Sequence, residues 1–79
     1  MKEINVLIVD DEPLAREIIQ THIAKIPNWK VTEKCINADE AYEALLKHNV
    51  DVLFLDIQMP VITGLEFLQS LKNPPLVIF

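Results

Sequence analysis

The sequence predicts an α/β domain with a parallel sheet and helices on both faces. Four segments are rich in apolar and β-branched residues, as strands are, and they cover residues 4–9, 29–36, 50–55 and 76–79. The three segments between them carry apolar residues at helical spacing. Strands that alternate with helices favour a parallel sheet with right-handed crossovers. We therefore expect one domain over residues 1–79, in the order β-α-β-α-β-α-β.

The first strand, Ile4–Val9, leads directly into an acidic turn and a helix. Pro13 suits the first turn of a helix, where its missing N–H is not needed. Apolar residues then recur at helical spacing, at Leu14, Ile18, Ile19, Ile23 and Ile26. Polar residues, Arg16 among them, occupy the other side, and Pro27-Asn28 is predicted to end the helix.

The second strand and helix have weaker signals. Charged and apolar residues alternate over residues 29–36, which favours a strand at the edge of the sheet. Asn37 and Glu40 have the spacing of a capping box, so a helix is expected to begin there. Its apolar face is expected to contain Ala41, Ala44, Leu45 and Leu46.

The third strand, residues 50–55, is almost continuously apolar, which predicts burial on both faces. It stops at Asp56. Thr63 and Glu66 then form a Thr-x-x-Glu capping box, which predicts the start of a third helix. Its predicted apolar stripe is Leu65, Leu68 and Leu71, its predicted end is Asn73-Pro74-Pro75, and a fourth strand follows at residues 76–79.

Two of these strands finish in carboxylates, and this is the main indication of function. If the first and third strands are parallel neighbours, Asp10, Asp11 and Asp56 meet at one edge of the sheet, where α/β proteins form their sites. Clustered carboxylates repel one another, and a hard divalent cation such as Mg²⁺ relieves the repulsion. Asp11 and Asp56 are candidate direct ligands, and a main-chain carbonyl just after Asp56 is a further candidate. Asp10 would act through water. An Asp carboxylate can also attack phosphorus. The other interpretation, solvated acids near helix starts, stays open at this point.

The composition excludes several classes of function. A net charge of −5 argues against general nucleic-acid binding and against docking on anionic lipid. No apolar run approaches the roughly 18 residues of a membrane span. The single cysteine, Cys35, cannot form an internal disulfide, so we expect a cytoplasmic protein. The single glycine, Gly64, excludes a glycine-rich phosphate loop.

Three features together resemble the receiver domain of bacterial two-component response regulators, of the LytR/AlgR type. They are the runs Leu7-Ile8-Val9-Asp10-Asp11-Glu12-Pro13 and Asp56-Ile57-Gln58-Met59-Pro60, and the following Gly64. The resemblance implies a flavodoxin-like (CheY-like) fold, of which this chain covers the N-terminal part. It also implies Asp56 as the phosphoacceptor, a sensor histidine kinase as the partner, and no enzyme activity beyond self-phosphorylation. The implied Mg²⁺ ligands are Asp11, Asp56 and the Gln58 main-chain carbonyl, with Asp10 acting through water.

The chain departs from the family pattern after its fourth strand. The Ser or Thr that follows this strand in the family, and the Lys at the end of a fifth strand, have no counterpart here. We expect the chain to be truncated, as a shortened expressed chain, a proteolytic fragment or the product of a partial gene. The uncovered fourth strand and sheet face predict self-association. DNA binding is expected only through an output domain that is absent from this chain.

Two functions therefore remain in competition. The first is a phosphoacceptor module that uses Mg²⁺ and Asp56. The second is a fragment that cannot be phosphorylated and acts only by binding metal or protein. A phosphatase with an Asp-x-Asp motif is disfavoured, because Gln58 stands two positions after Asp56.

Overall fold

In the computed structural model, which describes residues 2–79, four strands form one parallel sheet in the order β2-β1-β3-β4. The strands are β1 (Ile4–Val9), β2 (Trp29–Cys35), β3 (Val52–Leu55) and β4 (Leu76–Ile78). The helices that connect them are α1 (Pro13–Ile23), α2 (Ala38–Lys47) and α3 (Gly64–Gln69). The predicted order of elements and the flavodoxin-like fold are confirmed, and β2 lies at an edge of the sheet as expected.

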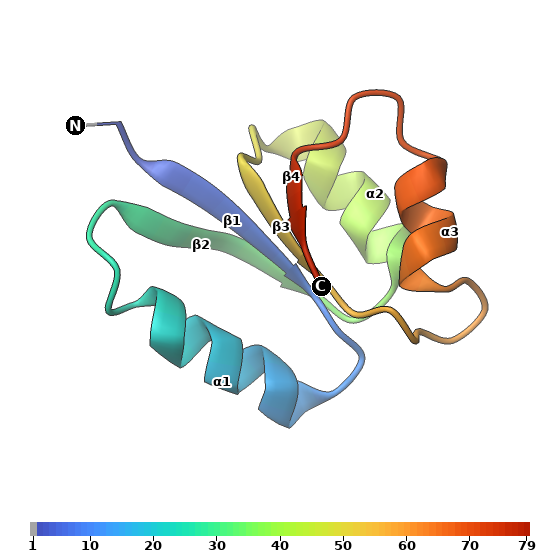
Figure 1. Ribbon diagram of the computed structural model, residues 1–79, viewed down its shortest axis with the longest axis horizontal. Coiled ribbons are helices and arrows are strands. Elements are labelled where there is room, and N and C mark those ends of the chain that lie inside the picture. Colours follow the sequence, from blue (N-terminus) through green and yellow to red (C-terminus); the bar gives the residue numbers. More distant parts are fainter. Residues whose placement is uncertain (1) are drawn as a thin grey trace.

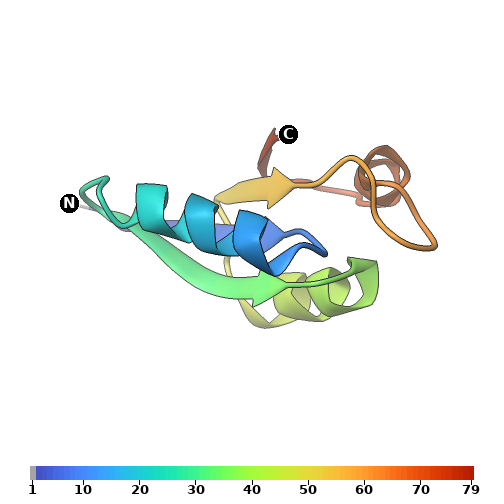
Figure 2. The ribbon, with the colours of Figure 1, turned by 90° about the horizontal axis from the view of Figure 1, so that it is seen from below.

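The helices cover opposite faces of the sheet. Figure 1 shows α1 on one side and α2 with α3 on the other, and Figure 2 gives the view from below. Side chains alternate between the faces along each strand, as the pleat requires. The buried strand residues that pack with α2 and α3 are Leu7, Val9, Cys35, Leu53 and Leu55. The buried strand residues that pack with Ile23 of α1 are Val6, Ile8 and Val52.

Helix α1 is shorter than predicted, and less of it faces the sheet. It ends at Ile23, so Ile26 lies in the turn that follows rather than on the helix. Leu14 is 66% exposed and Ile18 is 50% exposed, whereas Ile23 is buried. Of the apolar residues predicted at helical spacing, Leu14 and Ile18 therefore face solvent and Ile23 faces the sheet. The main-chain N–H groups of residues 24–26 bond to carbonyls three or four residues back, which tightens the chain into a turn before Pro27 is reached.

The apolar faces of α2 and α3 also differ from the prediction. Three alanines of α2 are buried, Ala38, Ala41 and Ala44, whereas Leu46 is 89% exposed. In α3, Leu65 is 51% exposed, and the buried side chain is that of Phe67. The ring of Phe67 packs edge-on against Tyr42 of α2, with centroids 4.8 Å apart. Helix α3 has only six residues and ends at Gln69, so Leu71 lies beyond it, although Leu68 and Leu71 both pack against the core as partly buried residues.

The ends of the helices and of β3 are fixed by short polar contacts. Both bonds of the predicted capping box are present, since Glu66 N–H donates to Thr63 Oγ1 at 3.1 Å and Thr63 N–H donates to Glu66 Oε1 at 3.0 Å. Strand β3 begins at Val52, two residues later than predicted. The preceding residue, Asp51, accepts a hydrogen bond from Asn5 N–H at 2.8 Å and so ties the start of β3 to β1. Over residues 2–79, none of the helices is both long enough and apolar enough to cross a membrane.

Candidate functional site

The acidic residues lie where β1 and β3 end side by side. Val9 and Leu55, the last residues of these strands, are partners in the parallel ladder, and Asp56 N–H donates to the Val9 carbonyl at 2.9 Å. Asp10 follows Val9 directly, and its N–H donates to the Cys35 carbonyl of β2 at 3.0 Å. Main-chain bonds therefore tie the end of β1 to both of its neighbours, β2 and β3, directly beside the acidic residues.

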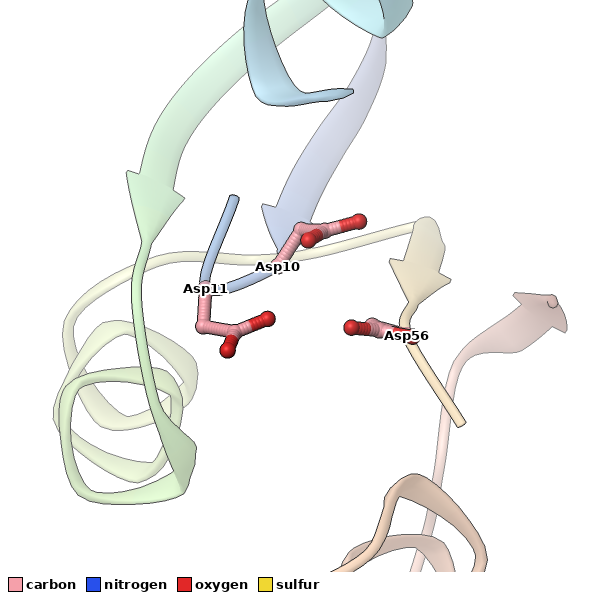
Figure 3. Close-up of side chains that lie close together, drawn as sticks. All are labelled: Asp10, Asp11 and Asp56. Carbon is pink, nitrogen blue, oxygen red and sulfur yellow. The ribbon is translucent and has the colours of Figure 1, made fainter. Parts of the chain in front are cut away.

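The structure brings together the three carboxylates that the strand ends predict. One oxygen from each of Asp10, Asp11 and Asp56 lies within 4.8 Å of the others. Figure 3 shows Asp11 and Asp56 facing one another across the gap between the two loops. Asp11 is exposed, and the other two are half-buried. The cluster therefore remains open to water on one side.

Main-chain donors orient two of these side chains. Glu12 N–H donates to Asp10 Oδ1 at 2.9 Å, and Gln58 N–H donates to Asp56 Oδ1 at 3.2 Å. Both are turns in which an Asp side chain accepts a bond from the main chain two residues on. Gln58 itself is exposed in the loop after β3. Its carbonyl as a metal ligand stays a prediction.

Within residues 2–79, the carboxylates of the cluster have no cationic partner in an ion pair. Burial raises the pKa of Asp56 above its ordinary value, and the negative charges of Asp10 and Asp11 raise it further. The Gln58 N–H opposes this rise by stabilising the ionised form. Clustered carboxylate oxygens with open access to water form a donor set suited to a hard divalent cation.

The raised pKa gives a stability effect with a defined sign. In the metal-free protein the folded state holds the Asp56 proton more tightly than the unfolded chain does. The contribution of Asp56 to the free energy of unfolding therefore falls as the pH rises from 3.8, the ordinary value, through its folded pKa.

We expect Asp56→Asn to raise the melting temperature of the metal-free protein at neutral pH, because it removes a repelled charge with little change in shape. The difference from the wild type should approach zero as the pH falls towards 3.8. Thermal unfolding of both proteins in chelator across this range provides the measurement. A difference that stays constant with pH would contradict this origin.

Sequence reasoning missed the structural roles of two residues that bear on the site. Gly64 lies against the main chain of Asp56, such that a Cβ atom would lie 2.1 Å from the Asp56 carbonyl oxygen. Arg16, predicted to be on the outer side of α1, donates from Nη1 to the Asp10 carbonyl at 2.7 Å. The only available signal for Arg16 was a long cationic side chain in the turn of helix that follows the acidic pair.

Comparison with known proteins gives a consistent result across almost the whole chain. The family model of the response regulator receiver domain matches residues 6–79. The chain is 46% identical over 78 residues to the transcriptional regulatory protein BtsR of Escherichia coli, with 96% of this chain and 33% of BtsR covered. It is 37% identical over 76 residues to the transcriptional regulatory protein LytR of Staphylococcus aureus, with 92% and 31% covered. The chain thus spans about a third of the length of these relatives.

Solved structures agree with the family model. CheY6 of R. sphaeroides, solved in complex with the P1 domain of CheA3, matches with a TM-score of 0.81 and 39% identity, covering 98% of this chain and 62% of that one. The response regulator TrrA of Thermotoga maritima, solved in complex with Mg²⁺ and BeF, matches with a TM-score of 0.76 and 34% identity, covering 89% and 57%.

Proposed function

Because this chain belongs to the response regulator receiver domain family, and so to two-component signalling, we propose that Asp56 accepts a phosphoryl group from a histidine kinase. In this proposal the bond between phosphorus and the histidine nitrogen breaks as a carboxylate oxygen of Asp56 bonds to phosphorus. The observation that carries the proposal is the placement of Asp56 beside two other carboxylates, at the end of a buried strand and open to solvent.

We propose that the acidic cluster binds Mg²⁺. Asp11, Asp56 and the Gln58 carbonyl would hold the ion directly, and Asp10 would act through water. A bound Mg²⁺ would neutralise charge on the transferring phosphoryl group. The residues of the chain orient the acceptor, since Gln58 N–H fixes one oxygen of Asp56 and the Val9 carbonyl fixes its main chain. The match to TrrA, solved with Mg²⁺ and BeF, supports this assignment.

The partner that we propose is a phosphohistidine-bearing domain of a kinase. The similar protein CheY6 was solved in complex with the P1 domain of CheA3. In this chain, Leu14 and Ile18 project from α1, the helix that follows the acidic loop, and both are exposed. An apolar helix surface beside the acceptor offers a place for such a domain to dock. BtsR and LytR are named as transcriptional regulatory proteins, and DNA binding would belong to an output domain outside these residues.

Transfer to Asp56 is tested by the mass of the intact protein after incubation with acetyl phosphate. We expect one phosphoryl group to be added when Mg²⁺ is present, and none when it is replaced by chelator. Asp56→Asn should add none, and Asp39→Asn, which changes an exposed acid of α2, should behave as the wild type. Folded wild-type protein that binds Mg²⁺ but gains no phosphoryl group would favour the alternative function, a receiver fragment that acts by metal or protein binding alone.

We also propose that the 79-residue chain self-associates. Among the strands of residues 2–79, β4 pairs on one side only, with β3. Beside it lies a groove of about 390 Å³ that includes Phe54, Ile78 and Phe79. An open strand edge next to apolar surface favours pairing with a second copy. Light scattering over a range of protein concentrations should show a dimer or larger species, and a monomer at every concentration would contradict this.

A further inference from the structure

We infer that Arg16 is a positioning residue of the acidic site, which holds the peptide between Asp10 and Asp11 so that the Asp11 carboxylate is presented to Asp56. The inference rests on the proposed function, because it assigns Arg16 a role in the Mg²⁺ affinity of that site. Arg16 is half-buried in the first part of α1, six residues after the carbonyl that it contacts.

The contact is short and charge-assisted. Arg16 Nη1 donates to the Asp10 main-chain oxygen at 2.7 Å, in the range of strong hydrogen bonds from a charged donor. That oxygen belongs to the peptide plane that joins Asp10 to Asp11. The orientation of this plane sets the direction in which the Asp11 side chain leaves the main chain. Arg16 therefore acts on Asp11 through the main chain.

Among the hydrogen bonds found within residues 2–79, the others in this loop hold the N–H and the side chain of Asp10, and only that of Arg16 holds this peptide plane. The Asp10 N–H donates to the Cys35 carbonyl, and its side chain accepts from Glu12 N–H. Asp11 is exposed and is repelled by its neighbours in the cluster. Without an anchor at the Asp10 carbonyl, the loop can relieve that repulsion by turning Asp11 away from Asp56. A loop so relaxed must be reorganised before it can bind a cation.

The charge of Arg16 by itself predicts the opposite result. A guanidinium near three carboxylates repels a cation that binds to them. Its removal would therefore strengthen metal binding if charge were its only effect. Arg16 makes no ion pair with any carboxylate of residues 2–79, so it does not serve as a fixed counter-ion of the cluster. Positioning and charge are therefore separated by the direction in which Mg²⁺ affinity changes.

The experiment measures the Mg²⁺ dissociation constant of the full 79-residue chain by titration calorimetry, with circular dichroism to establish that each variant is folded. Arg16→Met removes both the charge and the donor, and we expect it to weaken Mg²⁺ binding about tenfold, as loss of a group that orients metal ligands commonly does. Arg16→Lys keeps the charge and one possible donor, and we expect an intermediate affinity. Lys25→Met, which removes an exposed positive charge in the turn that follows α1, should not weaken binding.

Affinity in Arg16→Met equal to or tighter than that of the wild type would overturn the inference, because charge would then be the whole effect. If Arg16→Met does not fold, Arg16→Lys decides, and a wild-type affinity there would overturn the inference as well. Acetyl phosphate uptake by the wild type separates this inference from the proposed function. Wild-type protein that binds Mg²⁺ but takes up no phosphoryl group defeats phosphotransfer alone, and one that binds no Mg²⁺ defeats both.

Discussion

Gly64→Ala is expected to destabilise the domain by about 3 kcal/mol, as a severe steric insertion into packed structure does. A Cβ at this position would lie 2.1 Å from the Asp56 carbonyl oxygen and 2.9 Å from its carbonyl carbon. Both atoms are main chain, so no side chain can move aside to make room. Gly64 N–H also donates to the Ile57 carbonyl at 2.7 Å, which holds α3 against the end of β3. Relief of the clash must therefore displace the strand end that carries Asp56.

The effect of Gly64→Ala is measured by urea unfolding, and a matched control lies on the same helix. Gln69→Ala replaces an exposed side chain at the end of α3 and should change the free energy of unfolding by no more than about 0.5 kcal/mol. The Mg²⁺ affinity of any folded Gly64→Ala protein should also fall, because Asp56 is displaced. An unchanged unfolding midpoint would show that α3 approaches β3 less closely than the distance of 2.1 Å between the added Cβ atom and the Asp56 carbonyl oxygen implies.

Asp11→Asn is expected to have opposite effects on metal binding and on metal-free stability. Loss of a direct ligand should weaken Mg²⁺ binding by at least about tenfold, because removal even of groups that only support ligands has effects of this size. The same change removes one of three carboxylates whose oxygens lie within 4.8 Å. For a solvent-exposed pair at such distances the relief is worth about 1 kcal/mol. In a domain of this size that corresponds to a rise of about 4–8 °C in melting temperature.

The two effects of Asp11→Asn are measured on the same samples, by calorimetric titration with Mg²⁺ and by thermal unfolding in chelator. Glu17→Gln is the control, since it removes one negative charge from an exposed position on α1 outside the cluster. It should leave both quantities near their wild-type values. A metal-free Asp11→Asn protein that melts below the wild type would show that this carboxylate supports the fold rather than straining it.

The acidic edge was predictable because it depends on the order of strands and on where each strand stops. A nearly continuous apolar run identified β3, and alternation with helices implied parallel strands whose carboxyl ends share an edge. From there, the meeting of Asp10 with Asp56 required only that β1 and β3 be neighbours, which the sheet order confirms.

The details that sequence reasoning missed depend on contacts between elements. Phe67 is buried because α3 is short and turns its ring towards Tyr42 of α2, and helical spacing alone favoured the leucines on either side. Helix α1 ends at Ile23, four residues before Pro27, so no proline or glycine marks its end. The role of Gly64 is a close approach between two segments of main chain, without a positive φ angle that would mark it as a turn residue.

The pairing of β1 with β3 makes the acidic cluster a property of the folded chain alone. Asp10 and Asp56 lie far apart in the sequence and are brought together only when these strands pair. A cation that binds to both carboxylates has no such site in the unfolded chain. Its binding free energy therefore adds to the free energy of unfolding. Above the dissociation constant, each tenfold rise in free Mg²⁺ would add about 1.4 kcal/mol. The folded fraction of this small domain would then follow the magnesium level of its surroundings.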